Sequence, residues 1–373
     1  MGGHPWVYSS EIAKITGEPA DGDAVDLRDH KDRPHGSGLL NRKSRITVRR
    51  FTTGKEELDK NFFRQRLEAA LKYRKPTSAF RVVSSEADQL PGLIVDKFGD
   101  HLVLQALTLG IDKRKPMIVE LLRHLLQPKA ILERSDVPSR RLEGLPEFKG
   151  VLFGESTGIT TITIGGVQFE VNLLDDQKTG FFLDQAENYA LVGSHCAGKR
   201  VLDCFSYHGA FALFAAKGGA SRVEAIEISA SAGERAKVNI QRNGLAGKID
   251  FLCANAFDVL KKSDAEKRQF DVIILDPPTF TRTKDKVDDA LRGYKEINLR
   301  ALKMLPPGGL LATFSCSHHI TPDLLRDVVV AAAADAHKTI RLVKVLTQSA
   351  DHPILLAVPE TEYLKGLLIQ VIG

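Results

Sequence analysis

Cysteine is scarce in this sequence, and long apolar runs are absent. The 373 residues contain four cysteines, Cys196, Cys204, Cys253 and Cys316, and no C-x-x-C pair. This spacing argues against a disulfide framework and a structural zinc site, so we expect every cysteine to be a thiol and no metal to bind. No apolar run reaches the roughly 18 residues of a membrane span, and the first residues lack a secretory apolar core. We therefore predict a cytoplasmic protein without membrane association.

Two common nucleotide-binding fingerprints are also missing. Neither the G-x-G-x-x-G motif of dinucleotide-binding folds nor a Walker P-loop occurs, which argues against NAD and against nucleoside triphosphates. Positive charge is in small excess: the sequence contains 52 Lys and Arg and 47 Asp and Glu, which gives a net charge of +5 at pH 7. That balance permits a polyanionic partner without requiring one. The length of 373 residues predicts two or three domains of roughly 150 residues.

The region before residue 70 shows short strand patterns separated by turns. We predict strands over 24–28, 37–40 and 45–49. Five basic residues and no acid occur between positions 42 and 50, namely Arg42, Lys43, Arg45, Arg49 and Arg50. This run is either a solvated strand face or a surface that contacts phosphates, and the sequence leaves both open.

An α+β region without a catalytic signature follows. Apolar residues recur at helical spacing over 58–75, and Pro76 ends that segment. Gly165-Gly166 is a strong hairpin signal between strands 160–164 and 167–171. The remaining predicted elements are strands over 81–84, 93–95 and 102–107 and a helix near 116–126.

From about residue 198 the pattern alternates regularly between strands and helices. Strands are predicted over 200–204, 222–227, 250–253, 270–275, 310–314, 340–346 and 364–371. Helices are predicted over 210–217, 231–242, 257–262, 288–303 and 322–336. Repeated βαβ units imply a parallel sheet covered on both faces, which binds ligands at the carboxyl ends of its strands.

Polar residues follow three successive strands of this region. Asp203 ends the first strand, and Gly209 lies in the turn that leads to the next helix. Glu227 ends the second strand (227 − 203 = 24), close to the roughly 20-residue offset at which an acid binds a ribose diol. Asn255 ends the third strand, where an amide can read an adenine edge. Because a single glycine leaves little room for a pyrophosphate, S-adenosylmethionine (SAM) fits this pattern better than a dinucleotide.

Chemistry-bearing residues also follow the fourth and fifth strands. Asp276-Pro277-Pro278-Thr279-Phe280 forms a rigid turn without amide donors at the prolines, with a carboxylate at its base. Cys316 follows the fifth strand among polar residues, where a thiolate would be a good nucleophile. An ordinary strand exit and a buried cysteine are the alternatives for these two features. We interpret the other three cysteines as structural.

Several of these segments together resemble one family. They are 176–185, 203–211, 276–280, 292–298, 313–317, 350–353 and 363–366, with Gly3-His4-Pro5-Trp6-Val7-Tyr8 and the arginine-rich strand around 45–50. On these motifs, which cover nearly the whole chain, the sequence resembles the PUA-domain-containing class I SAM-dependent 23S rRNA (cytosine-5)-methyltransferases. The resemblance implies a multi-domain fold: a β-rich PUA-like RNA-binding module (1–70), a central α+β domain (71–172) and a Rossmann-like α/β methyltransferase domain (173–373).

The resemblance also implies roles for individual residues. SAM or the bound base would contact Asp203, Ser206, Gly209, Glu227, Asn255 and Asp276, with Lys178 and Thr179 closing over the methionine end. Cys316 would be the nucleophile, Asp276 would stabilise charge on the base, and the basic run would bind RNA. The sequence departs from the family at Pro277-Pro278, where related enzymes carry Pro-Cys, at Ala186 in place of an arginine, and at Asn255 in place of an acid.

Three functions remain to be distinguished. The first is methylation of cytosine C5 in 23S rRNA through a covalent Cys316 adduct. The second is methylation of guanine N7 or of an amino group in RNA without Cys316. The third is a non-catalytic RNA-binding factor in ribosome assembly. We expect ribosomal RNA, most simply 23S rRNA, as the partner, and we keep a homodimer as an open alternative to a monomer.

Overall fold

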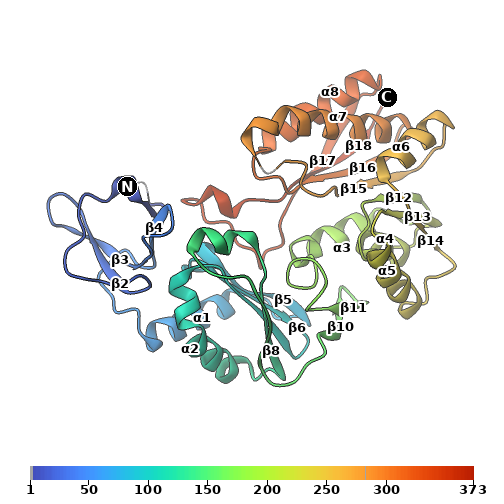
Figure 1. The fold of residues 1–373 in the computed structure, drawn as a ribbon. Coiled ribbons are helices and arrows are strands. Elements are labelled where there is room, and N and C mark those ends of the chain that lie inside the picture. Colours follow the sequence, from blue (N-terminus) through green and yellow to red (C-terminus); the bar gives the residue numbers. More distant parts are fainter. Residues whose placement is uncertain (1–2, 282) are drawn as a thin grey trace. The chain divides into compact units, whose positions relative to one another are not determined.

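The computed structural model describes residues 3–281 and 283–373, which form two compact units. Unit 1 contains residues 1–162, 171–183 and 350–361, and unit 2 contains residues 163–170, 184–349 and 362–373. The chain therefore returns to unit 1 after residue 349 and completes unit 2 last (Figure 1). The predicted boundaries at 70/71 and 172/173 stay a prediction, because the compact units are not contiguous in sequence.

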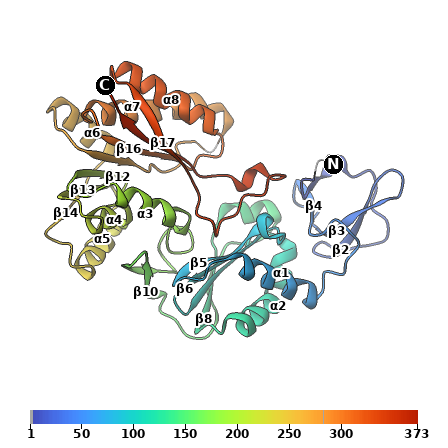
Figure 2. The ribbon, with the colours of Figure 1, turned by 180° about the vertical axis from the view of Figure 1, so that it is seen from behind.

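Unit 1 begins with a small antiparallel sheet in the order β1-β4-β3-β2, whose strands β2, β3 and β4 are labelled in Figure 2. Its strands are β1 (Trp6–Tyr8), β2 (Ala24–Arg28), β3 (Pro34–Leu40) and β4 (Ile46–Arg50). Val7, Leu40 and Val48 form a small buried core. The three predicted strands are confirmed, and β1 is an addition that the pattern did not predict.

A second sheet of unit 1 has the order β5-β6-β7-β8-β9 and packs against two helices. Its elements are α1 (Lys60–Tyr73), β5 (Ala79–Ser84), β6 (Leu93–Phe98), β7 (His101–Ala106), α2 (Leu109–Leu126), β8 (Ala130–Ser135) and β9 (Phe148–Phe153). Phe63 and Leu67 of α1 are fully buried in the same core as Val82 and Leu104. Because α1 packs against this sheet, residue 70 lies inside a helix of the second sheet's layer.

Two features of this layer differ from the sequence expectation. Helix α2 starts at Leu109, before the predicted start, and contains Pro116. The lost amide donor is tolerated because Ile111 and Ile118 are both fully buried on either side of the proline. Strands β8 and β9 were not predicted. In β8 the buried Glu133 pairs with Lys115 of α2 (2.9 Å). Because this charged residue interrupts the apolar pattern, the sequence does not predict a buried strand here.

The predicted hairpin is confirmed as a separate two-stranded sheet of β10 (Ile159–Ile164) and β11 (Val167–Asn172). Gly165 and Gly166 turn the chain with φ of 52° and 75°, a conformation that glycine adopts without steric cost. In the part of the chain that is described, no helix is long and apolar enough to cross a membrane.

Unit 2 contains a seven-stranded sheet in the order β14-β13-β12-β15-β16-β18-β17. Its strands are β12 (Arg200–Cys204), β13 (Arg222–Glu227), β14 (Ile249–Cys253), β15 (Val272–Leu275), β16 (Leu310–Ser315), β17 (Ile340–Thr347) and β18 (Lys365–Val371). The first five strands of this order are parallel, and β18 is antiparallel to both β16 and β17. The central strands β15 and β16 are entirely buried, whereas the edge strand β17 is largely exposed.

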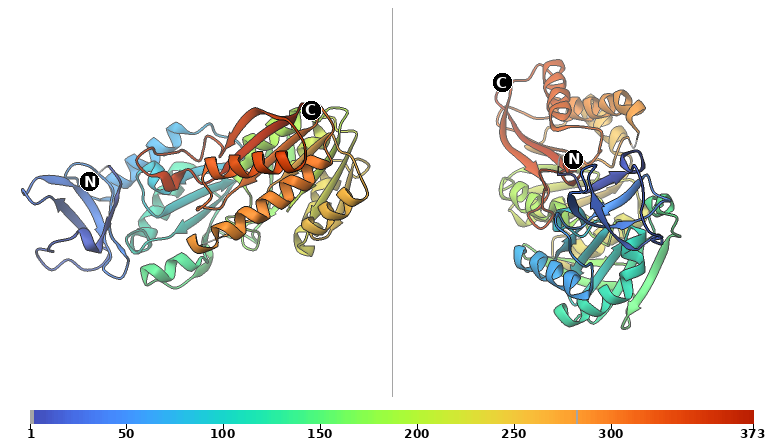
Figure 3. Two further views of the ribbon diagram at one scale, coloured as in Figure 1. Left: turned by 90° about the horizontal axis from the view of Figure 1, so that it is seen from above. Right: turned by 90° about the vertical axis from the view of Figure 1, so that its left-hand side faces the viewer.

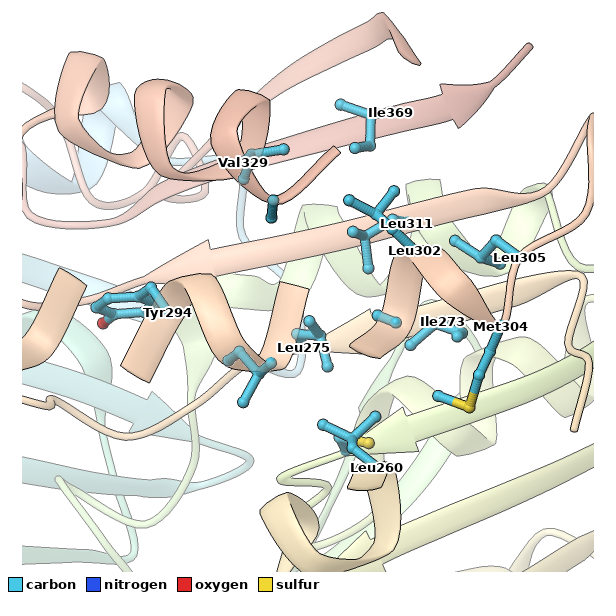
Figure 4. Packing of buried hydrophobic residues seen from close by; sticks show 14 of the residues in the cluster. Leu260, Ile273, Leu275, Tyr294, Leu302, Met304, Leu305, Leu311, Val329 and Ile369 are labelled. Atoms are coloured by element: carbon cyan, nitrogen blue, oxygen red, sulfur yellow. The ribbon is translucent and has the colours of Figure 1, made fainter. Parts of the chain in front are cut away.

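Helices cover both faces of this sheet. They are α3 (Ala186–Ser194), α4 (Ala210–Lys217), α5 (Ala230–Arg242), α6 (Ala256–Ala265), α7 (Val287–Lys303) and α8 (Pro322–Asp335). Helices α3, α4 and α5 lie on one face, and α6, α7 and α8 lie on the other, where α7 and α8 run side by side (Figure 3). The core on this second face joins Leu302 and Val329 to Leu311 and Ile369 of the strands (Figure 4). Helix α3 was not predicted from the sequence.

Neighbouring valines of α8 test this packing. Val329 is 1% exposed, and Val330 is 55% exposed. Val329→Ala should lower the free energy of unfolding by about 2 kcal/mol, because it removes two buried carbon atoms and leaves a cavity. Val330→Ala is the matched control and should change stability by less than about 0.5 kcal/mol. Equal shifts in the urea midpoints of the two variants would contradict the packing described.

Candidate active site

The carboxyl ends of five parallel strands bring the predicted residues of unit 2 to one edge of the sheet. In the strand register, Cys204 of β12 lies between Ile226 of β13 and Leu275 of β15, and Leu275 is paired with Thr313 of β16. Asp203 and Glu227 lie in the last residues of β12 and β13, and the segments that leave the strands carry Ser206, Gly209, Asn255, Asp276 and Cys316. The structure therefore gathers all these residues at one edge of the sheet.

Asp203 is a fully buried carboxylate in this edge. Its Oδ2 accepts hydrogen bonds from Ser206 Oγ (2.6 Å) and from the Ala212 amide (3.0 Å). Among the described residues, Oδ1 has no hydrogen-bond donor. Burial raises the pKa of Asp203 from 3.8 to about 7, the Ser206 hydrogen bond opposes this, and the negative charges of Asp276 and Glu227 add to the increase. The site thus contains a buried acceptor atom and an unbalanced negative charge.

Glu227 holds the loop between β12 and α4 in a strained conformation. Its Oε2 accepts from the Tyr207 amide (2.9 Å), and its Oε1 accepts from the Ser229 amide (2.8 Å). Phe205 and Tyr207 have φ of 64° and 49°, in the left-handed region that side chains disfavour. Gly209, with φ of 79°, then starts α4. Such strain is found at ligand-binding loops that the surrounding structure fixes.

Asn255 and Asp276 lie on either side of these two acids. The Asn255 side chain is exposed and accepts from the Phe257 amide (2.9 Å), so that it caps α6. Asp276 Oδ2 accepts from Gln185 Nε2 (3.0 Å). Gln185 Oε1 in turn accepts from Asn188 Nδ2 (2.6 Å), which fixes the orientation of the Gln185 amide. The Asp276 carboxylate is therefore held from the start of α3.

Cys316 directly contacts the loop that Asp276 begins. Its Sγ lies 3.2 Å from Thr279 Oγ1 and 4.0 Å from the Pro277 carbonyl oxygen. Cys316 is half-buried. The structure thus joins the two motifs that the sequence placed after the fourth and fifth strands, with a hydroxyl group beside the thiol.

The other cysteines differ from Cys316. Cys196 and Cys204 are fully buried, and burial raises the pKa of Cys196 to about 12 and that of Cys204 well above its usual range. Neither forms a thiolate near neutral pH, in agreement with a structural role. The interpretation of Cys253 as a structural residue was wrong, because the outer face of the edge strand β14 is open and this thiol is exposed.

Lys178 and Thr179 belong to unit 1. Thr179 is buried and donates to Asp96 Oδ2 (2.6 Å), and the Lys178 ammonium lies 4.6 Å from the centre of the Phe182 ring. Asp96 also pairs with Arg81 (2.8 Å). Their expected position over the methionine end of SAM stays a prediction.

The basic run of the first sheet divides into exposed and engaged residues. Lys43 and Arg45 are exposed. Arg42 is exposed as well and pairs with Asp21 (2.9 Å). Arg49 pairs with the buried Glu143 (2.8 Å), and Arg50 donates to the Gly3 carbonyl oxygen (3.0 Å). Arg49 therefore joins the first sheet to the segment after β8 within unit 1.

Three further residues of the site had no role assigned from the sequence. Gln185 positions Asp276, Tyr294 bonds both serines beside Cys316, and Lys365 donates to the Ser317 carbonyl oxygen. All three lie in motifs that carried the family resemblance. Their partners are distant in sequence, so no spacing rule identifies what they contact.

The donor and acceptor set fits SAM. The buried Oδ1 of Asp203 can accept from an ammonium group, and the negative charge around it suits a cationic ligand. Both oxygens of Glu227 keep a lone pair for ribose hydroxyl groups after accepting from the backbone. The strained loop between β12 and α4 presents its backbone between these two acids.

The raised pKa of Asp203 predicts a pH-dependent stability. A carboxyl group whose pKa is raised from 3.8 to about 7 contributes stability below pH 3.8 that is lost as the pH rises toward 7. Without SAM, the free energy of unfolding of the wild type should therefore fall relative to that of Asp203→Asn across this range. Chemical denaturation of both proteins from about pH 4 to 8 measures the difference. Parallel pH curves would contradict the buried, charged environment of Asp203.

Comparison with known proteins agrees with this architecture. Residues 146–368 match the model of S-adenosylmethionine-dependent methyltransferases, and residues 2–53 match a PUA-like domain. The chain is 41% identical to ribosomal RNA large subunit methyltransferase I of Shewanella denitrificans, over 99% of this chain and 95% of that protein. It is 39% identical to the protein of the same name from Aeromonas salmonicida, over 98% of this chain and 95% of that protein.

Solved structures share the fold. A methyltransferase complexed with SAH superposes with a TM-score of 0.84 at 21% identity, covering 99% of this chain and 96% of that chain. A SAM-dependent methyltransferase from Streptococcus mutans gives a TM-score of 0.83 at 21% identity with the same coverage. The predicted class I methyltransferase fold and PUA-like module are thereby confirmed. The chain belongs to the family of S-adenosylmethionine-dependent methyltransferases, and it carries a PUA-like domain ahead of its methyltransferase domain.

Proposed function

We propose that this enzyme methylates C5 of a cytosine in 23S rRNA through a covalent bond to Cys316. The observation that carries the proposal is the contact of Cys316 Sγ with Thr279 Oγ1 (3.2 Å), in the loop that Asp276 begins. This contact joins the Cys316 thiol to the loop that begins with the Asp276 carboxylate, which supports a role for Cys316 as nucleophile. The relatives named ribosomal RNA large subunit methyltransferase I support the substrate class.

SAM supplies, when bound, a methyl group that an electron-rich carbon atom can attack. Asp203, Ser206, Gly209, Glu227, Asn255 and Asp276 would hold it, and a contact with Lys178 and Thr179 stays a prediction. Asp203 would receive its cationic end, and Glu227 would receive its ribose hydroxyl groups. Asn255 already caps α6 through its side-chain oxygen, which leaves its NH₂ group to donate.

Cys316 would activate C5 of cytosine for methyl transfer. C5 of cytosine is a poor nucleophile on its own, and a bond from the Cys316 thiolate to C6 moves an electron pair of the ring onto C5. C5 would then bond to the methyl carbon of SAM as the bond from that carbon to the sulfonium sulfur breaks, and the sulfur would keep the electron pair. When the C5 proton leaves, its bonding electrons restore the C5–C6 double bond, and the C6–sulfur bond breaks to regenerate the thiolate.

Asp276 would stabilise the base during addition. Its carboxylate is fixed by Gln185, and its next neighbour Pro277 contacts Cys316 through the carbonyl oxygen (4.0 Å). In its protonated form, the Asp276 carboxyl group would donate to N3 of cytosine and accept from the amino group as negative charge develops on the ring. The rigid Asp276-Pro277-Pro278 turn requires no reorganisation for this task.

The target cytosine must leave its stack to reach Cys316, so the substrate is an unpaired or locally opened RNA segment. The first sheet supplies exposed cations for the flanking phosphates, namely Arg42, Lys43 and Arg45, with Arg49 and Arg50 beside them. A cytoplasmic location and a homodimer stay predictions.

Cys316→Ala tests the covalent route. We expect no methyl transfer to unmodified rRNA, because C5 is not activated, while SAM binding measured by calorimetry stays within about twofold of wild type. Cys253→Ala is the matched control and should keep full activity. Nucleoside digestion and mass spectrometry should identify 5-methylcytidine with the wild type. Full activity of Cys316→Ala, or a methylated purine, would refute the proposal.

Lys43→Ala combined with Arg45→Ala tests the RNA surface. The double variant should bind RNA more weakly at low salt, and its slope of log K against log salt should fall by about 1 to 1.5, roughly 0.7 for each lost phosphate contact. Lys14→Ala with Lys31→Ala, exposed residues of the same region, is the control for net charge. Equal losses in the two double variants would show that net charge, rather than this surface, binds RNA.

A further inference from the structure

Lys365 is a buried lysine at the start of β18. Its side chain donates hydrogen bonds to the Ser317 carbonyl oxygen (2.9 Å) and the Tyr363 carbonyl oxygen (3.0 Å). In the antiparallel pairing of β16 with β18, Lys365 lies opposite Ser315, the residue that precedes Cys316. Ser317, which follows Cys316, thus holds the Lys365 ammonium group. The strand that carries Lys365 pairs with Ser315, which precedes Cys316.

This cation forms no ion pair with any carboxylate in the described part of the chain. Two hydrogen bonds to carbonyl oxygens leave one N–H and the full positive charge of the ammonium to be balanced. The ionisable groups that act on it are Cys316 and Glu362, and Glu362 is exposed to solvent. Burial lowers the pKa of Lys365, and Cys316 and Glu362 oppose this. Of these two groups, Cys316 is the one next to the residue that holds the Lys365 ammonium, so its sulfur can balance this charge.

The remaining groups around Cys316 suit an anionic sulfur at a fixed position. Tyr294 of α7 contacts Ser315 Oγ (2.9 Å) and Ser317 Oγ (3.1 Å), on both sides of the cysteine. Thr279 offers its hydroxyl group to Sγ at 3.2 Å. Asp276 and Cys316 both act electrostatically on Tyr294, so Asp276 is a negative charge near Cys316. Its repulsion disfavours a thiolate at Cys316. A cation at Lys365 offsets that repulsion.

We propose that Lys365 is the counter-cation that holds Cys316 as a thiolate before RNA binds. Lys365 is then a positioning residue, acting through Cys316 rather than on the substrate, and its role rests on the proposed function of Cys316 as nucleophile. The Cys316 proton leaves to solvent, and the resulting thiolate remains beside the Lys365 ammonium. The hydrogen bond to the Ser317 carbonyl oxygen keeps the ammonium in place when the sulfur enters and leaves its bond to C6.

Alkylation of the full-length protein by iodoacetamide tests this assignment without turnover. Peptide mass spectrometry gives the rate at Cys316 and, as an internal control in the same molecule, at the exposed Cys253 across pH 5–10. In the wild type, the pH midpoint of Cys316 alkylation should lie below that of Cys253. In Lys365→Met it should rise by about one pH unit, equivalent to about tenfold slower alkylation near pH 7, while that of Cys253 stays unchanged.

Lys344→Met, an exposed lysine of β17, is the matched control and should leave both midpoints unchanged. Thermal unfolding and SAM binding establish that each variant is folded. Should Lys365→Met fail to fold, Lys365→Arg replaces it and is expected to keep the wild-type midpoint, because it keeps the charge. A wild-type midpoint at or above that of Cys253, an unchanged midpoint in folded Lys365→Met, or a raised one in folded Lys365→Arg would overturn the proposal.

The test of Lys365 as counter-cation can fail independently of the test of Cys316 as nucleophile. If Cys316→Ala keeps its activity, the covalent route fails whatever the alkylation profiles show. If Cys316→Ala is inactive and the Cys316 midpoint does not respond to Lys365, the covalent route stands and the counter-cation assignment fails.

Discussion

The parallel direction of five neighbouring strands is the constraint on which the site depends. Asp203, Glu227, Asp276 and Cys316 come from separate strand ends, and the order β14-β13-β12-β15-β16 brings those ends to one edge. The complete burial of β15 and β16 holds the two loops that carry Asp276 and Cys316 in register. An antiparallel strand among the five would send its loop to the opposite edge. The chemistry of unit 2 is therefore a consequence of the sheet's topology.

Charge divides this edge into two parts. Around β12 and β13 the carboxylates Asp203 and Glu227 lie together with Asp276, and burial raises the pKa of Asp203 to about 7. Negative charge concentrated in this way suits a cationic cofactor such as SAM. Around β16 and β18 the charge is reversed, since the buried Lys365 ammonium faces the Cys316 side. This division agrees with the proposed binding of a cationic cofactor at one part of the edge and the proposed thiolate at the other.

Much of unit 2 could be predicted from the sequence because its elements follow simple patterns. Continuous apolar strands such as β15, alternating with amphipathic helices, fix the βαβ order and so the edge where Asp203, Glu227 and Asp276 meet. Unit 1 was harder. Strand β8 carries a buried Glu133 whose partner Lys115 lies on another element, and α2 continues through Pro116 because tertiary packing outweighs the lost hydrogen bond. Lys365 illustrates the same limit, since no spacing relates it to the Ser317 carbonyl oxygen.

The covalent bond between Cys316 and the base is the central claim, and it can be trapped directly. RNA in which 5-fluorocytidine replaces cytidine would be incubated with the wild-type enzyme and SAM. Fluorine at C5 cannot leave as a proton does, so the bond from sulfur to C6 should persist after methyl transfer. The account predicts a denaturation-resistant protein–RNA complex whose linked peptide contains Cys316. Methylated RNA without such a complex, or a link to another residue, would contradict it.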